Sequence, residues 1–168
     1  MPEAIEAGYR YIDTVNAYFN EVAVGRVVAG SPVACEDFFV TTKLFPQSYP
    51  YAQCGPDIDA TLERLGMDYV DLLLLHQPYG EYMAGWRAME EAVEAGRVRS
   101  IGLSNFSAAK VRDILPAKLM ARTQSTTVAE CYNYSKNKIK WQVRYAIFCR
   151  HSNATGIGKD STRWENCV

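Results

Sequence analysis

The sequence predicts an α/β fold in which strands and helices alternate around a parallel sheet. Short apolar runs alternate with amphipathic stretches four times, with a period of roughly 30 residues, as in successive βα units. One of these runs, residues 69–75, contains four consecutive leucines and is apolar on both faces, as a strand covered on both sides must be. Ionisable and polar side chains follow the apolar runs. Together these observations predict a parallel sheet whose strands deliver chemically active groups at their carboxyl ends.

Each expected strand is followed by a helix, and glycine or proline marks most of the boundaries. The expected strands are residues 9–13, 38–43, 69–75 and 98–103. The expected helices are residues 1–8, 20–29, 57–65, 81–95 and 107–115. The segment 45–56 is rich in Pro, Tyr and Gly and is expected to form a loop.

Two architectures accommodate these units, a doubly wound open sheet and a (β/α)₈ barrel. Asp13, Lys43, His76 and the pair Ser104-Asn105 stand at the carboxyl ends of four successive expected strands. In a barrel these ends converge on one mouth, whereas an open sheet spreads them along an edge. No G-x-G-x-x-G follows a strand, which argues against a dinucleotide-binding open sheet. The pattern therefore favours the barrel.

Composition and charge exclude several classes of protein. The chain has 168 residues with a net charge of −1 and no basic cluster, which argues against nucleic acid or an anionic membrane as a partner. There is no apolar run of ~20 residues and no secretory signal at the start. The five cysteines are scattered, without disulfide or metal-ligand spacing, so we expect no metal site and a reducing, cytoplasmic location.

The periodic signal weakens after residue 116. Residues 122–142 are polar and irregular, although 126–130 has the composition of a strand, and residues 143–149 form another apolar stretch. Residues 151–168 show no periodicity and are expected to be disordered or poorly packed. We therefore divide the chain into a barrel portion, residues 1–120, and a divergent or irregular C-terminal segment, residues 121–168.

The residues at the expected mouth match the chemical needs of carbonyl reduction. Hydride comes from a nicotinamide, and the developing alkoxide must receive a proton. A phenol supplies that proton when a nearby ammonium favours the phenolate, and a buried ammonium needs a carboxylate partner. A neutral imidazole can orient the carbonyl. Asp13, Tyr18, Lys43 and His76 are such a set. Each alone has an ordinary structural explanation, but such explanations do not predict Asp13, Lys43 and His76 at successive strand ends with Tyr18 five residues after the first.

The sequence motifs around these four residues point to a protein family more specifically than the four residues do. The motifs are Gly8-Tyr-Arg-Tyr-Ile-Asp-Thr14, Phe39-Val-Thr-Thr-Lys-Leu44, Leu65-Gly-Met-Asp-Tyr-Val-Asp-Leu72, His76-Gln-Pro78, and Gly96-Arg-Val-Arg-Ser-Ile-Gly-Leu-Ser-Asn-Phe106. In order and spacing they resemble the aldo-keto reductase superfamily from about residue 1 to residue 115. The resemblance implies a (β/α)₈ barrel and reduction of aldehyde or ketone carbonyls to alcohols.

The resemblance also implies a role for each catalytic candidate. Tyr18 would donate the proton, Lys43 would favour its release, and Asp13 would pair with Lys43. His76 would orient the substrate carbonyl.

The implied cofactor is NADPH, with NADH as the alternative. Asp13, Ser104 and Asn105 would contact the cofactor, the last two through the nicotinamide carboxamide. The residues implied to line the pocket for a small carbonyl substrate are Tyr18, Phe45, His76 and Tyr79.

The chain also departs from the family pattern. A complete barrel of this kind is roughly 250 residues or more, so we expect a partial, incomplete barrel of about five to six βα units that begins inside the first helix. Glu130 has a family counterpart, but the cofactor motifs of the sixth and seventh strands are not recognisable. Unpaired strand edges favour self-association and impaired activity. The alternative function is a non-catalytic binding or regulatory protein on the same scaffold.

Overall fold

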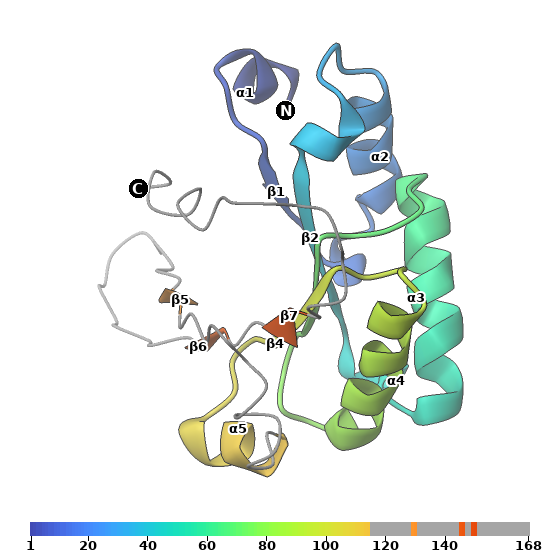
Figure 1. The fold of residues 1–168 in the computed structure, drawn as a ribbon, viewed down its shortest axis with the longest axis vertical. Helices are drawn as coiled ribbons and strands as arrows, with labels where there is room; N and C mark the ends of the chain where they lie inside the picture. Colours follow the sequence, from blue (N-terminus) through green and yellow to red (C-terminus); the bar gives the residue numbers. More distant parts are fainter. Residues whose placement is uncertain (115–128, 131–144, 147–148, 151–168) are drawn as a thin grey trace.

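The computed structural model describes residues 1–114, 129–130, 145–146 and 149–150. Its centre is a sheet in the order β1-β2-β3-β4-β7 (Figure 1). The first four strands, β1 (Tyr11–Asp13), β2 (Phe39–Leu44), β3 (Leu72–Leu75) and β4 (Ser100–Leu103), are parallel. β7 (Cys149–Arg150) joins β4 as an antiparallel neighbour.

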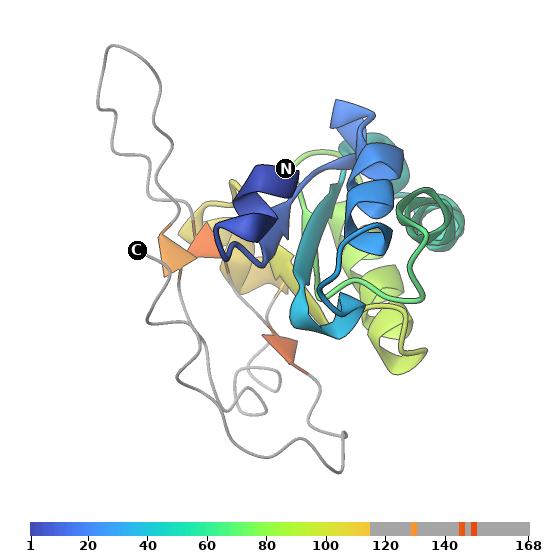
Figure 2. The same cartoon turned by 90° about the horizontal axis from the view of Figure 1, so that it is seen from above.

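The helices connect the strands and cover one face of the sheet. The α-helices are α1 (Pro2–Glu6), α2 (Glu21–Ala29), α3 (Tyr51–Leu65), α4 (Tyr82–Glu94) and α5 (Ala108–Ile114), and the 3₁₀ helices are η1 (Asn16–Tyr18), η2 (Cys35–Asp37) and η3 (Pro46–Ser48). Two views at right angles place α2, α3 and α4 together on the same side of the strands (Figures 1 and 2). Four βα units therefore lie within the described residues, which confirms the predicted alternation and a partial α/β barrel.

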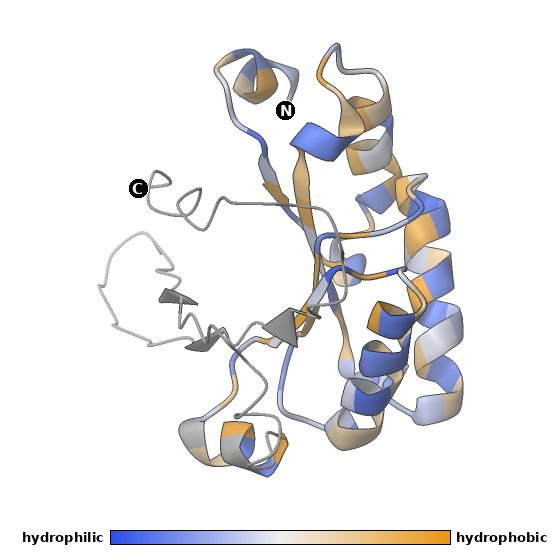
Figure 3. Cartoon of the chain, in the orientation of Figure 1, coloured by the Kyte–Doolittle hydropathy of each residue, from blue (hydrophilic) through white to orange (hydrophobic). Residues whose placement is uncertain are grey.

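The hydrophobic core lies between the sheet and this layer of helices. Strand side chains alternate between faces, and Val40, Leu73, Leu75, Ile101 and Leu103 are the alternate residues that join the core cluster, each at most 2% exposed. The covering helices α2, α3 and α4 each carry both apolar and polar residues, as amphipathic helices of an outer layer do (Figure 3).

The strand register brings the carboxyl ends together. Asp13 lies opposite Thr41, so Lys43 on β2 extends two residues beyond the end of β1. Leu44 lies opposite Leu75, and Leu75 lies opposite Leu103. Lys43 itself lies opposite Leu74. His76 and Ser104, the residues that directly follow β3 and β4, are therefore level with each other and two positions beyond Lys43, at the carboxyl end of the sheet where a barrel mouth forms.

Helix α3 begins earlier than the sequence predicts. Residues 45–56 were expected to form a loop, which is wrong for Tyr51–Pro56, because α3 spans Tyr51–Leu65. Pro50 precedes the helix, and its carbonyl accepts bonds from the amides of Gln53 and Cys54, each at 2.9 Å. Burial of Cys54 and Ile58 against the core outweighs the missing backbone donor of Pro56. Tertiary packing here overrides local composition.

The expected strand over residues 69–75 is shorter in the structure, where β3 begins at Leu72. Val70 forms only an isolated parallel bridge with Val98. Asp71 lies between Val70 and the first residue of β3, and its buried carboxylate accepts a hydrogen bond from the backbone amide of Val40 at 2.9 Å. It also pairs with Arg99 at 3.1 Å. Asp71 therefore fixes β2 and β3 at their amino ends, opposite the candidate site.

Little of the C-terminal segment is described. Of the expected strand over residues 126–130, the structure shows β5 (Ala129–Glu130), which pairs antiparallel with β6 (Tyr145–Ala146) in a separate two-stranded sheet. The expected apolar stretch 143–149 includes β6 and Cys149 of β7. The remainder of residues 121–168, including the predicted aperiodic stretch 151–168, lies outside the described residues, apart from Cys149–Arg150. No helix in the described ranges is long and apolar enough to cross a membrane.

Candidate active site

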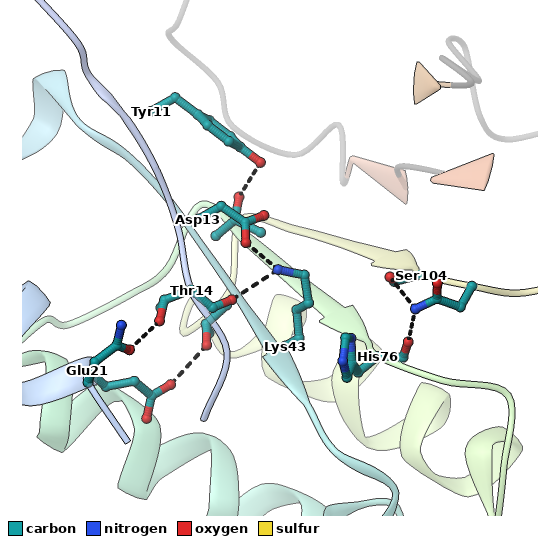
Figure 4. Close-up of polar contacts among 11 residues, drawn as sticks. Tyr11, Asp13, Thr14, Glu21, Lys43, His76 and Ser104 are labelled. Carbon is teal, nitrogen blue, oxygen red and sulfur yellow. Dashed lines mark hydrogen bonds and ion pairs between the residues drawn. The ribbon is translucent and has the colours of Figure 1, made fainter. Parts of the chain in front are cut away.

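Lys43 is held near the carboxyl end of β2 by two oxygen atoms from the end of β1. Its Nζ forms an ion pair with the Asp13 carboxylate, and it donates a hydrogen bond to the carbonyl oxygen of Thr14 at 3.1 Å (Figure 4). The Lys43 side chain is 13% exposed, whereas that of Asp13 is 44% exposed. An ammonium has three N–H groups. Two of the three N–H groups of Lys43 bond to Asp13, the last residue of β1, and to Thr14, which follows it. The ammonium is therefore oriented, and its charge is neutralised.

The loop that carries Tyr18 is closed at its base by a side-chain hydrogen bond. The Thr14 hydroxyl donates to Oδ1 of Asn20 at 2.6 Å, across the five residues between them. Thr14 is fully buried and also supplies the carbonyl oxygen that contacts Lys43. One threonine therefore links the position of the Tyr18 loop to the position of the ammonium.

Tyr18 is the last residue of η1, and its side chain is 66% exposed. It is followed by Phe19, which has a left-handed backbone conformation, φ 53°, and is 95% exposed. Within the described part of the chain, the Tyr18 hydroxyl makes no hydrogen bond to Lys43. The structure thus places Tyr18 on the loop that follows Asp13 but does not join it to the Asp13–Lys43 pair.

A buried ionic network anchors the other side of this loop. Glu21, the first residue of α2, is 1% exposed, accepts a bond from the Thr42 hydroxyl at 2.8 Å and pairs with Arg64 at 2.7 Å. Arg64 also donates to Thr61 at 3.0 Å. The network connects α2, β2 and α3 directly beneath the loop. Sequence reasoning did not assign these residues to the site.

His76 directly follows β3 and is half-buried. Its backbone amide donates to the carbonyl oxygen of Leu44 at 3.0 Å, so it is tied to the residue that follows Lys43. Its ring packs beside Phe45, with 5.6 Å between ring centroids. The structure brings the expected substrate residues His76 and Phe45 together.

Ser104 and Asn105 lie beside His76, immediately after β4. The Ser104 amide donates to the Leu75 carbonyl at 2.9 Å. The Asn105 side-chain amide donates to the His76 carbonyl at 2.8 Å and to Ser104 Oγ at 3.1 Å (Figure 4). Asn105 also has a left-handed backbone, φ 63°, a conformation that asparagine tolerates better than most residues. The turn therefore presents a hydroxyl and an amide side by side, a donor and acceptor set that fits a carboxamide.

Tyr79 is on the loop that follows His76, and its side chain is 63% exposed. Lys110 of α5 donates to the Pro78 carbonyl at 2.6 Å, and its ammonium lies 5.9 Å from the centroid of the Tyr79 ring. Helix α5 thus holds this loop in place. Among the described residues, no hydrogen bond or ring contact joins Tyr79 to Tyr18, Phe45 or His76.

Tyr49 was missed because it is one of 11 tyrosines and lies in the segment expected to be a loop. Its side chain is fully buried, and its hydroxyl contacts the backbone of Leu44, the last residue of β2, and of Gln77, two residues after β3. Burial raises the pKa of Tyr49 to about 12, so the phenol stays neutral. A tyrosine in a Pro-rich segment gave no signal for such a position.

The described residues contain no group of three His, Cys, Asp or Glu side chains able to hold a metal ion. The chemistry available at this edge of the sheet is therefore that of an oriented ammonium, an imidazole, a phenol and a hydroxyl–amide pair.

Comparison with known proteins assigns the chain to a family. The model of the Aldo/keto reductase family matches residues 1–155. An aldo-keto reductase of Mycolicibacterium vanbaalenii is 48% identical over 115 residues, which cover 67% of this chain and 41% of that protein. An aldo-keto reductase of Mycobacterium tuberculosis is 45% identical over the same share of each chain.

Solved structures agree with the sequence comparison. The crystal structure of an aldo/keto reductase from Brucella melitensis is 44% identical, with a TM-score of 0.67, and covers 68% of this chain and 46% of that chain. An aldo-keto reductase from Bombyx mori, solved in complex with NADP, is 38% identical with a TM-score of 0.63, covering 67% of this chain and 41% of that chain. The chain therefore spans less than half the length of these relatives. On this sequence and fold, the chain belongs to the aldo/keto reductase family and forms part of its α/β barrel.

Proposed function

We propose that this chain carries the chemical centre of an NAD(P)H-dependent carbonyl reductase. The observation that carries the proposal is the orientation of the Lys43 ammonium by the Asp13 carboxylate and the Thr14 carbonyl. An ammonium held this way near the end of one strand favours the phenolate form of a phenol brought beside it, and an imidazole follows the next strand. Similarity to aldo-keto reductases supports the same reading.

Each residue then has a distinct task. Tyr18 delivers the proton to the developing alkoxide from its exposed loop. Lys43 stabilises the phenolate that remains, because its charge is directed by β1 rather than by solvent. His76 orients the carbonyl oxygen of the substrate.

NADPH, or NADH in its place, supplies the hydride when bound. The Ser104 hydroxyl and the Asn105 amide, which follow β4, are the groups we propose to hold the nicotinamide carboxamide, and Asp13 at the end of β1 is the third proposed cofactor contact. The Ser104 and Asn105 side chains bond to each other at 3.1 Å, and we propose that bonds to the carboxamide replace this one. The adjacent bond from Asn105 to the His76 carbonyl keeps the turn in register with β3.

The substrate class we propose is small aldehydes and ketones, including sugar-derived carbonyls. The Phe45 ring packs at a tilt beside the His76 ring, and Tyr79 lies on the loop that follows His76. Aromatic side chains around an imidazole favour a compact carbonyl over a large charged ligand.

Two measurements test the proposal. NADPH fluorescence is titrated with the 168-residue chain, and turnover of a small aldehyde is followed by NADPH absorbance. Tyr18→Phe is expected to lower turnover by about 10²-fold or more while leaving the NADPH dissociation constant unchanged, because it removes one proton donor. Tyr9→Phe, at another exposed tyrosine, is the matched control.

The outcomes separate the candidate functions. Turnover that survives Tyr18→Phe would show that another group donates the proton. Absence of binding in the titrations of both NADPH and NADH would rule out reductase chemistry in this chain. NADPH binding without turnover would assign the alternative, a non-catalytic binding or regulatory protein.

A further inference from the structure

Tyr49 occupies a position between the ends of the two strands that carry Lys43 and His76. Tyr49 directly follows η3, and Pro50 separates it from the first residue of α3. It is 0% exposed. Its hydroxyl reaches the backbone of Leu44, the last residue of β2, and of Gln77, two residues after β3.

The Tyr49 hydroxyl bonds to both strand ends. The Gln77 amide donates into the hydroxyl oxygen at 3.0 Å. The hydroxyl hydrogen has two acceptors, the Gln77 carbonyl at 3.0 Å and the Leu44 carbonyl at 3.3 Å. Leu44 directly follows Lys43, and Gln77 directly follows His76. One oxygen atom therefore bridges the backbone next to both residues.

Helix α4 packs closely against the base of the Tyr49 side chain. On α4, a Cβ added at Gly85 would lie 3.3 Å from both Cα and Cβ of Tyr49 and 3.3 Å from Cδ2 of Leu75. Glycine at this position lets the helix approach the base of Tyr49 closely. The hydroxyl is thus fixed from the side of the helix layer, independently of the loops above the site.

We propose that Tyr49 is a positioning residue that sets the His76 ring relative to the Lys43 ammonium by clamping the backbone after both. The catalytic consequence rests on the function proposed above. Removal of the hydroxyl leaves a part-buried Gln77 amide without this acceptor, and the chain must shift to recover one. Because catalysis is sensitive to displacements of about 1 Å, such a shift reaches His76 even though Tyr49 touches no substrate.

The first test does not depend on activity. The chain contains two histidines, His76 and His151, so its ¹⁵N-histidine spectrum has two sets of ring signals, which His151→Gln assigns. Tyr49→Phe is expected to shift or broaden the His76 ring signals. Tyr51→Phe is the control, because that hydroxyl bonds to Glu91 on the outer face of α4. Unchanged His76 signals in Tyr49→Phe, or an equal change in Tyr51→Phe, would overturn the proposal.

The second test measures reduction kinetics. Tyr49→Phe is expected to lower kcat about 10-fold with an unchanged NADPH dissociation constant, whereas Tyr51→Phe leaves both unchanged. A fall in NADPH affinity with constant kcat would contradict positioning of His76. If the parent chain shows no turnover, the reductase proposal fails while the histidine spectrum still decides the role of Tyr49.

A third measurement covers a Tyr49→Phe variant that does not fold. In the parent chain, the Gln77 amide is expected to exchange its hydrogen slowly, because it donates to a buried oxygen. Exchange at the rate of an open amide would show that the clamp is not formed and would overturn the proposal.

Discussion

At the scale of single residues, the charged side chains in and beneath the candidate site each form an ion pair with a specific side chain of opposite charge. Lys43 is matched by Asp13, and Glu21 is matched by Arg64 and Thr42. The strand-end residues could be predicted because each follows a recognisable apolar run. The partners Thr14 and Thr42 could not, because their roles arise from contacts between segments distant in the sequence.

Loss of the partner of Glu21 is expected to destabilise the fold. Arg64→Ala leaves a carboxylate that is 1% exposed without its cation. Because Arg64 is itself 41% exposed and partly screened by water, we expect a loss of about 2 kcal/mol, below the full cost for a completely buried pair. The measurement is the free energy of unfolding in urea. Arg26→Ala, at an exposed position of α2, is the control, and equal losses in both would contradict the assignment.

Glu90 gives a pH dependence of stability whose sign follows from its environment. Burial raises the pKa of Glu90 above 4.5, and the hydrogen bond from the Trp86 indole only partly offsets this. The folded state therefore binds the proton more tightly than the unfolded state. This contribution is fully present below about pH 4.5 and is lost as pH rises through the raised pKa.

Glu90→Gln is expected to flatten this part of the profile, since glutamine still accepts the indole hydrogen bond and does not ionise. Urea midpoints of parent and variant, compared from pH 4 to pH 8, test it. The exposed Glu63→Gln serves as the reference. A parent profile that rises over this range relative to Glu90→Gln would refute the assigned direction.

At the scale of elements, close helix packing determines which residues are tolerated. Helices α2 and α3 approach so closely at Gly25 that an added Cβ would lie 2.0 Å from the Leu65 carbonyl oxygen. The sequence predicted both helices but not this approach, because a glycine within a helix has the same local pattern whether or not another backbone lies against it. The early start of α3 was missed for a related reason, since burial of Cys54 outweighs the Pro and Gly content of its first turns.

Two alanine substitutions in these helices are expected to act in opposite directions. Gly25→Ala must separate α2 from α3 and should cost about 3 kcal/mol or more. Gly55→Ala, where an added Cβ meets nothing within 4 Å, should be stabilising by about 0.5–1 kcal/mol because alanine favours the helix. Thermal midpoints of both variants check this. A stable Gly25→Ala protein would show that the two helices pack differently.

At the scale of the whole molecule, the parallel sheet has an edge at β1. In the part of the chain that the structure describes, β1 pairs with β2 and with no other strand. Tyr9 and Tyr11 beside this edge are 69% and 45% exposed. Unpaired edges favour pairing with another chain.

We therefore expect the 168-residue chain to self-associate as its concentration rises. Sedimentation velocity over a concentration range of about 10-fold should show an increasing mean sedimentation coefficient. Tyr9→Lys should reduce this increase, because a charge beside an edge strand opposes pairing. Tyr51→Lys makes the same charge change on α3. A monomer at every concentration would contradict the expectation.

The sequence by itself determined the alternation of strands and helices, the family and the residues at the strand ends, because apolar periodicity and local motifs are properties of short segments. Only the tertiary structure decided how Lys43 is oriented, where α3 begins and that Tyr49 bridges the backbone beside Lys43 and His76. Those features depend on contacts between segments that are far apart in the chain. The local amino-acid composition does not predict such contacts, and burial in the core can favour a different secondary structure from the one that the composition predicts.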